Sequence, residues 1–296
     1  PGIVSGLALI VSAFTEKKDR IIIQPPVYQP FFTVVEEQER TLVTNPLKIE
    51  NGRYVMDYDD LEAKLKMGAK LLILSNPHNP VGRSWTKVEL TQLAQLCLRY
   101  HCLIVSDEIH SDLMMPGITH IPVATIDEEI AHITITCMSP SKTFNLAGMS
   151  ISEIIISNKS LRDRFENQVN ARLHLQMGNL FGDLALEAAY TYGEEWLEAL
   201  KIYLAANSAC VANALKANFP EIKFYPNEAT YLLWMDFSAL GFSHEELYRK
   251  LIFDCKLGFN DGLLFGKEGK GFMRMNVACP HQKVEEAMGL LLQLKK

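Results

Sequence analysis

Three short segments of the sequence combine side chains that could bind and activate a small molecule. They are residues 75–82 (SNPHNPVG), residues 106–110 (SDEIH) and residues 139–144 (SPSKTF). The first offers asparagine amides held by prolines, the second two carboxylates and a histidine, and the third a lysine between hydroxyls. A carboxylate can pair with a cationic ligand, a lysine amine can form a Schiff base with a carbonyl, and hydroxyls can bind a phosphate.

Each segment also has an ordinary explanation. Two Asn-Pro steps and a glycine are typical of a tight turn, adjacent carboxylates are typical of a solvated loop end, and most lysines lie on the surface. The combination favours a site, because each segment directly follows a short apolar run that predicts a strand.

The elements that must position these segments alternate between strands and helices. Strands are predicted, in chain order, at residues 21–24, 70–75, 102–106, 132–137 and 151–157. Residues 86–100 predict a helix that begins with a capping box of Thr86 and Glu89. Apolar strands separated by helices predict an α/β fold with a largely parallel sheet covered on both faces. Such sheets bind ligands at the carboxyl ends of their strands, where all three segments lie.

The apolar run at residues 2–14 predicts a buried helix rather than a membrane or signal segment. It is shorter than the roughly 20 apolar residues that a membrane helix needs, and no basic leader precedes it. We therefore expect no membrane partner.

After about residue 160 the pattern changes, which predicts a second domain. Residues 160–215 are mostly helical in composition, and further elements follow as strands at 231–237 and 271–277 and helices at 243–256 and 280–296. We expect a large domain over residues 1–195 and a smaller α+β domain over residues 196–296.

Composition excludes several classes of protein. Hydrophobic residues make up 48% and charged residues 22% of the 296 residues, which excludes a disordered chain and a coiled coil. A net charge of −6 provides no basic field for nucleic acid. The six cysteines include no C-x-x-C pair, which argues against a disulfide scaffold or zinc ribbon and favours the reducing cytoplasm.

Four residues outside the three segments could also do chemistry. Cys97, His101 and Cys102 are candidate metal ligands, but Cys97 falls on an apolar helix face and Cys102 opens a strand. Buried thiols are therefore the better interpretation. Cys279 could be a reactive thiol, although no feature of the sequence supports this role.

In order and residue type, the three segments resemble those of the fold-type I pyridoxal-phosphate enzymes, the aspartate aminotransferase superfamily. The resemblance covers essentially the whole chain. It implies that family's fold, with a mostly parallel seven-stranded sheet flanked by helices and a smaller α+β carboxyl-terminal domain. It also implies pyridoxal 5′-phosphate (PLP) as the cofactor.

The resemblance assigns roles around the cofactor ring. Lys142 would carry the cofactor and act as the catalytic base. Asp107 would pair with the protonated pyridine nitrogen, Asn79 would bond the ring O3′, and Tyr28 would stack on the ring. His110 would touch the cofactor or brace Asp107, and we favour bracing.

Further roles concern the phosphate and the substrate. Ser139 matches a phosphate ligand, and Ile3 and Val4 would offer backbone N–H groups to the phosphate at a helix start. Arg274, in the segment GFMRMN, matches the arginine that binds the substrate α-carboxylate with its planar fork. Tyr28 would also contact the substrate.

Departures from the common pattern point to one branch. His110 stands where typical aminotransferases have a tyrosine, and Ser150 stands where they have a phosphate-binding arginine. Residues 107–110, 141–148 and 271–280 look like those of the cystathionine β-lyase-type C–S lyases, the MalY/PatB group that includes cystalysin. The implied function is α,β-elimination of L-cystathionine or a related sulfur amino acid to pyruvate, ammonia and a thiol.

Two other functions stay open. One is a PLP-dependent aminotransferase, and the other is a PLP-binding regulatory protein without turnover. The resemblance also implies a homodimer. Family members carry several dozen residues before the position of Pro1, so we expect the small domain here to lack its first part.

Overall fold

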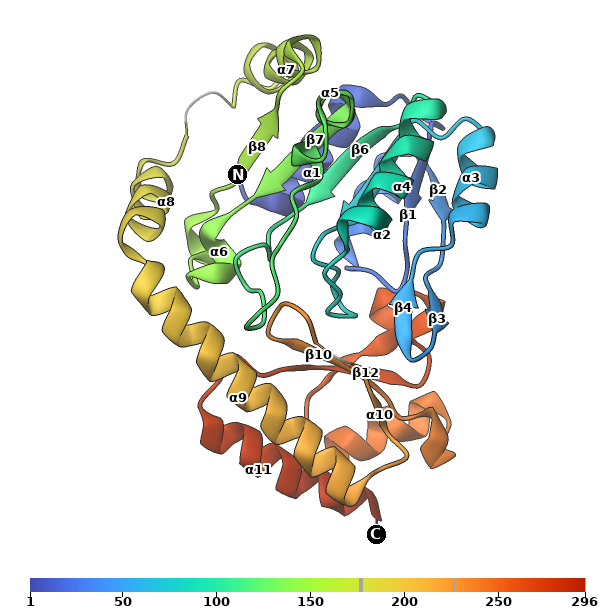
Figure 1. Ribbon diagram of the computed structural model, residues 1–296, viewed down its shortest axis with the longest axis vertical. Coiled ribbons are helices and arrows are strands. Elements are labelled where there is room, and N and C mark those ends of the chain that lie inside the picture. Colours follow the sequence, from blue (N-terminus) through green and yellow to red (C-terminus); the bar gives the residue numbers. More distant parts are fainter. Residues whose placement is uncertain (176–177, 226, 296) are drawn as a thin grey trace.

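The computed structural model describes residues 1–175, 178–225 and 227–295 of the chain. Its larger part is built on one six-stranded sheet (Figure 1). In spatial order the strands are β2 (Thr41–Thr44), β1 (Arg20–Ile23), β5 (Leu71–Ser75), β6 (Leu103–Asp107), β7 (Thr134–Met138) and β8 (Glu153–Ile156). Neighbouring strands are parallel except β8, which runs antiparallel to β7.

The α/β class and the largely parallel sheet are therefore confirmed, but the expected number of seven strands is wrong for the described residues. The sheet has six strands there, because the edge strands β2 and β8 each pair on one side only. The other predicted strands belong to a separate sheet.

Alternate residues of each central strand enter two different cores. Ile21 and Ile23 pack on one face of the sheet and Ile22 on the other, as the period of two in a strand requires. One face is covered by α1 (Ile3–Phe14), α2 (Pro30–Glu36) and α7 (Lys159–Glu166), and the other by α3 (Tyr58–Lys66), α4 (Lys87–Arg99) and α5 (Glu128–Ile133). The predicted buried helix at residues 2–14 is confirmed as α1.

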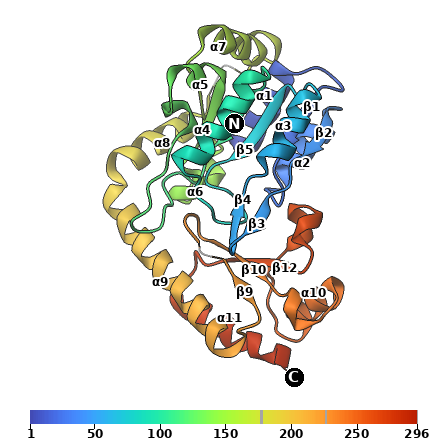
Figure 2. The same cartoon turned by 45° about the vertical axis from the view of Figure 1, so that its right-hand side comes forward.

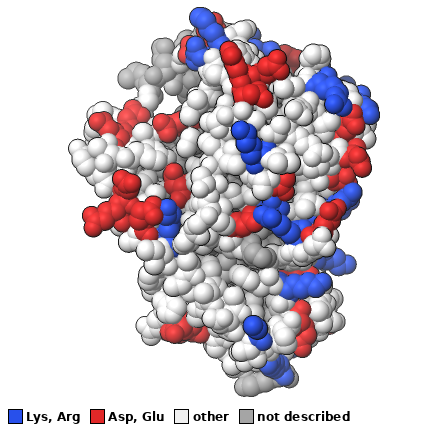
Figure 3. Space-filling view, in the orientation of Figure 1, with Lys and Arg blue, Asp and Glu red and all other residues white. Residues whose placement is uncertain are grey.

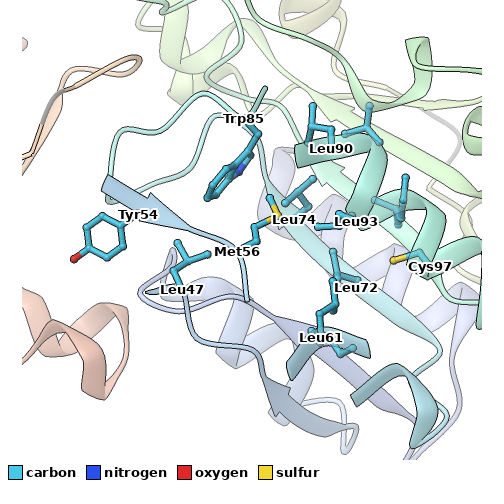
Figure 4. Close-up of a cluster of buried hydrophobic side chains, with 14 of the residues drawn as sticks. Leu47, Tyr54, Met56, Leu61, Leu72, Leu74, Trp85, Leu90, Leu93 and Cys97 are labelled. Atoms are coloured by element: carbon cyan, nitrogen blue, oxygen red, sulfur yellow. The ribbon is translucent and has the colours of Figure 1, made fainter. Parts of the chain in front are cut away.

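Helix α4 shows how local sequence signals set an element that supports the sheet. The predicted capping box is present, with Thr86 and Glu89 each bonding the other's backbone N–H. Leucines of α4 pack over Leu72 and Leu74 of β5, and Cys97 lies in the same cluster (Figure 4). Cys97 and Cys102 are fully buried, which confirms the interpretation as core thiols.

The smaller part contains a four-stranded antiparallel sheet. Its spatial order is β11 (Asn260–Asp261), β12 (Phe272–Asn276), β10 (Leu232–Asp236) and β9 (Lys223–Phe224). Helices α9 (Glu194–Asn218), α10 (His244–Phe253) and α11 (His281–Leu291) supply residues to its core. Helix α9 runs without a break from the larger part to the smaller one (Figure 1), and residue 196 lies inside it. The domain boundary at residues 195/196 stays a prediction.

Further elements lie outside the two main sheets. They include the hairpin of β3 (Lys48–Glu50) and β4 (Arg53–Val55), the short helix α6 (Pro140–Thr143), the π-helical turn Asn167–Arg172 and helix α8 (Leu180–Tyr192). The β3–β4 hairpin reaches toward β10 (Figure 2). Acidic and basic side chains are interspersed on the face shown in Figure 3. Within the three described ranges, every helix is too short or too polar to cross a bilayer.

Candidate active site

The carboxyl ends of β5, β6 and β7 lead into a cavity of about 430 Å³, which the start of α1 and strand β12 also border. All of the predicted site residues except Ser139 line it: Ile3, Val4, Tyr28, Asn79, Asp107, His110, Lys142 and Arg274. These residues come from the first and last thirds of the chain as well as from the middle. The location agrees with the rule for open α/β sheets.

The two adjacent carboxylates at the end of β6 point to different environments. Asp107 lines the cavity, and one of its oxygens accepts the Ile109 N–H at 3.2 Å. Burial raises the pKa of Asp107 to about 7. Glu108 is absent from the cavity lining and accepts hydrogen bonds from the Ser106 hydroxyl (2.9 Å) and the Val123 N–H (3.1 Å).

His110 lines the cavity together with Asp107. Its ring meets the Tyr231 ring edge-on, with 6.0 Å between centroids. Burial, together with the charges of Lys142 and Arg274, lowers the pKa of His110 to about 3, so the ring is neutral at neutral pH. Its Nδ1 atom is buried and has no hydrogen-bond partner among the described residues. No hydrogen bond in that part of the chain joins it to Asp107, so bracing would have to act through packing.

The turn after β7 places Lys142 in the cavity and turns Ser139 away from it. Pro140 begins α6, and the Ser139 side chain caps that short helix by accepting the Ser141 N–H. The Ser139 hydroxyl donates to the Ile151 carbonyl at 2.7 Å. Ser141, one helical step from Lys142, lines the cavity instead. The phosphate role of Ser139 stays a prediction.

The start of α1 forms the opposite end of the cavity. The first N–H groups of a helix have no acceptor within the helix, and the helix dipole makes them a favourable site for an anion. Gly2, Ile3, Val4 and Ser5 all line the cavity here. The Ser152 hydroxyl donates to the Pro1 carbonyl at 2.6 Å and holds this end beside the segment that precedes β8.

Arg274 reaches the cavity from β12 in the smaller part. Its guanidinium donates to the Asn79 Oδ1 atom (2.9 Å) and to the Asn260 Oδ1 atom (2.9 Å and 3.3 Å). It also lies 4.6 Å from the centroid of the Phe265 ring. Burial lowers the pKa of Arg274 to about 10. Among the described residues only neutral oxygens bond this guanidinium, so it can still bind a carboxylate.

Several cavity residues were missed by sequence reasoning. Asn276 lies two residues after Arg274 on β12, and the strand period of two could have found it. Tyr231 enters from the loop before β10, and only the fold brings it to the cavity. Ser75, the first residue of the segment 75–82, lines the cavity as well, although no role was assigned to it. Ser5 also lines the cavity, and a lone serine in an apolar run gives no signal in a single sequence.

The arrangement can hold a ligand that combines several groups. An anionic group fits the start of α1, a cationic ring nitrogen fits Asp107, and a carbonyl fits the Lys142 amine. A carboxylate fits Arg274.

The fold and the cavity are those expected of the PLP-dependent aminotransferase superfamily, and the comparisons with known proteins agree. The sequence model of the aminotransferase class I and II family matches residues 1–291, so the chain belongs to that family.

Similar proteins within this family include a cystathionine beta-lyase and cystalysin. Cystathionine beta-lyase PatB of Bacillus subtilis is 42% identical over 289 residues, which are 97% of this chain and 74% of PatB. Protein MalY of Escherichia coli is 32% identical over 294 residues, which are 99% of this chain and 74% of MalY. The solved structure of cystalysin from Treponema denticola, which contains PLP, superposes with a TM-score of 0.95 and 37% identity over 99% of this chain and 75% of cystalysin.

Proposed function

We propose that the protein is a PLP-dependent C–S β-lyase, which cleaves L-cystathionine or a related sulfur amino acid to pyruvate, ammonia and a thiol. One observation carries the proposal: an amine, a carboxyl group and a guanidinium (Lys142, Asp107 and Arg274) face one cavity. None of the three forms an ion pair within the described ranges. The relatives named PatB and cystalysin support the reaction class.

The residues that would contact PLP include charged groups that form no ion pair among the described residues. Burial raises the pKa of Asp107, no described cation forms an ion pair with it, and a protonated pyridine nitrogen would supply that cation. The N–H groups of Ile3 and Val4 and the Ser139–Ser141 turn would hold the phosphate. Tyr28 would cover one face of the ring. When bound, PLP supplies an electron sink for carbanion chemistry.

The chain's own residues would then orient the substrate and move its protons. Arg274 binds the α-carboxylate through its fork and, by its bond to Asn79, keeps that carboxylate at a fixed position relative to the ring site. The Lys142 amine takes the proton from the substrate Cα. The electron pair left on Cα would form a double bond to Cβ as the bond between Cβ and sulfur breaks, and the electrons of that bond would leave with the sulfur as a thiolate. Water would then hydrolyse the released enamine to pyruvate and ammonia. The neutral His110 and Tyr231 rings exclude water from one wall of the cavity.

The same residues would serve an aminotransferase, so the test must separate products. Purified protein with PLP is incubated with L-cystathionine, L-cystine or S-methyl-L-cysteine, and pyruvate is measured with and without added keto acids. We expect pyruvate release without any keto acid. Keto acid-dependent amino transfer without pyruvate would identify an aminotransferase. Cofactor absorbance with no turnover of any amino acid would identify a PLP-binding regulatory protein.

The assembly and location are part of the proposal. We propose two domains, residues 1–195 and 196–296, in a homodimer located in the cytoplasm. Leu180 and Phe181 of α8 are 68% and 73% exposed. Exposed apolar side chains at adjacent positions support a contact with another protein chain. The described cysteines are all free thiols, which supports a reducing compartment. Light scattering in solution tests the dimer.

A further inference from the structure

A loop of the smaller part clasps the two segments that carry the site residues of β5 and β6. The N–H groups of Glu228 and Ala229 both donate to the Gly82 carbonyl, at 2.8 and 3.2 Å. On the other side, the Thr230 N–H donates to the Leu113 carbonyl at 2.7 Å. Residues 227–230, which we call the clasp loop, therefore lie between the turn that carries Asn79 and the segment that follows His110.

The Glu228 side chain fastens the clasp loop from behind the cavity. Its Oε2 atom accepts the Arg83 Nε–H (3.1 Å) and the Ser84 N–H (2.8 Å), and its Oε1 atom accepts an N–H of Arg53. The Arg83 side chain is only 3% exposed, and its other end donates to both carboxylate oxygens of Glu89, at 2.8 and 2.9 Å. The cluster thus joins the β3–β4 hairpin, the Asn79 turn, helix α4 and the clasp loop.

The turn is shaped to receive the loop. Gly82 has a φ of +70°, and a Cβ atom there would lie 2.1 Å from the Asn227 Oδ1 atom. A side chain at this position would displace the Asn227 side chain, and the left-handed backbone also favours glycine.

The clasp loop leads directly to the groups that face the cavity. Tyr231 follows it and lines the cavity, and β10 then pairs with β12 so that Trp234 lies opposite Arg274. The Arg274 guanidinium bonds Asn79, which belongs to the turn that the loop grips. The separation between the carboxylate site and the ring site is thus set where the loop meets the turn.

We propose that Glu228 is a positioning residue for substrate recognition: it locks the clasp loop to the Asn79 turn and thereby fixes Arg274 and Tyr231 over the cavity. The inference rests on the proposed function. Glu228 does not line the cavity, so its effect passes through the groups that do. Loss of the lock should weaken the binding of the amino-acid carboxylate much more than it slows the chemical step.

The test compares Glu228→Gln with Glu62→Gln in PLP-loaded protein. Glu62 is a suitable control because it also bonds several donors, including Tyr100 and Arg99, but lies on α3, away from the clasp loop. L-norleucine, which has no sulfur to eliminate, serves as the binding probe in titration calorimetry. Glu228→Gln should raise its Kd about tenfold and the KM for L-cystathionine by a similar factor, with kcat changed by less than about twofold. Glu62→Gln should change none of these values.

Two further variants keep the test decisive. Glu228→Asp retains the charge with a shorter reach and should show a smaller rise in Kd, even if Glu228→Gln fails to fold. Gly82→Ala strains the left-handed backbone whose carbonyl accepts the Glu228 and Ala229 N–H groups, and it should also raise the Kd. Unchanged norleucine affinity in Glu228→Gln and Glu228→Asp, with only a lower melting temperature, would overturn the positioning role. If the unmodified protein cleaves no sulfur amino acid, the proposed function fails, while norleucine affinity still decides the role of Glu228.

Discussion

Arg83 ends the turn that follows β5 and Arg274 bonds Asn79 within that turn, and the partners of the two guanidinium groups differ in charge. Arg83 is bonded to two carboxylates, Glu89 and Glu228, whereas Arg274 is bonded to the amide oxygens of Asn79 and Asn260. Arg83 is buried and Arg274 is partly buried, and among the described residues only Arg83 meets opposite charges. A buried charge that the fold neutralises holds the structure together, and a buried charge that it leaves open is available to a ligand.

The adjacent carboxylates of β6 repeat the same contrast. Glu108 accepts hydrogen bonds from Ser106 and Val123 and lies 2.7 Å from the His120 ring nitrogen. Among the described residues, the Asp107 carboxylate accepts a single backbone N–H, and burial raises its pKa. Glu108 is therefore a structural carboxylate and Asp107 a carboxylate of the site, and they differ in the number of hydrogen-bond donors that each one binds.

The largest effect is expected when the amine of Lys142 is removed from the cavity. Lys142→Ala should lower kcat/KM by about 1000-fold or more, because no other described amine lines the cavity to move the Cα proton. Pyruvate release from L-cystathionine measures the effect, and Lys87→Ala on the surface of α4 is the matched control. Residual activity within about tenfold of the unmodified protein would place the base elsewhere.

Removing the buried Arg83, whose charge is neutralised by two carboxylates, should instead lower stability. Arg83→Met leaves Glu89 and Glu228 without their buried cation and should lower the free energy of unfolding by about 3 kcal/mol. Urea unfolding measures this change. Arg99→Met removes an exposed arginine that pairs with Glu62, and its cost should stay below about 1 kcal/mol. Equal costs for the two variants would contradict the structural role given to the buried Arg83 ion pairs.

Opening the carboxylate site should affect substrate binding rather than stability. Arg274→Ala should raise the KM for L-cystathionine roughly 30-fold, since a charge-assisted bidentate bond is lost. Arg274→Lys should recover only part of the affinity, because an ammonium lacks the planar fork. Steady-state kinetics provide both values, and an unchanged KM in Arg274→Ala would refute the carboxylate role.

The smallest expected effect is a pH dependence in cofactor-free protein. Folding raises the pKa of Asp107 to about 7, so its contribution to stability is full below its ordinary pKa and is lost as the pH rises through 7. Asp107→Asn should therefore gain stability relative to the unmodified protein by roughly 1 kcal/mol per pH unit between pH 5 and 7. Urea unfolding at both pH values measures this. His78 and His110, with lowered pKa values, act in the opposite direction but are present in both proteins. A difference that does not vary with pH would contradict the raised pKa.

Much of the fold could be predicted because its signals are local. The capping box of Thr86 and Glu89 set the start of α4, and apolar runs marked the strands whose ends carry Asn79, Asp107 and Lys142. The roles of these residues came from a resemblance in which order and spacing carried the information. The strand count did not follow in the same way, because the sheet edges depend on which strands pair.

The missing parts of the site depend on contacts between distant residues. Glu228 and Arg83 are 145 positions apart, so nothing near either one indicates the pair. Tyr231 lines the cavity and directly follows the clasp loop, which bonds the Asn79 turn far away in sequence. The turn geometry at Ser139, whose hydroxyl bonds Ile151, likewise appears only in three dimensions.

The most direct test of the central claim is to find which amine holds the cofactor. Protein loaded with PLP is reduced with borohydride, which fixes the cofactor to that amine as a pyridoxyl adduct, and the digested peptides are analysed by mass spectrometry. The open cavity predicts a single adduct on Lys142. An adduct on another lysine would contradict the assignment of this cavity as the active site. So would the absence of any adduct in protein that still contains bound PLP.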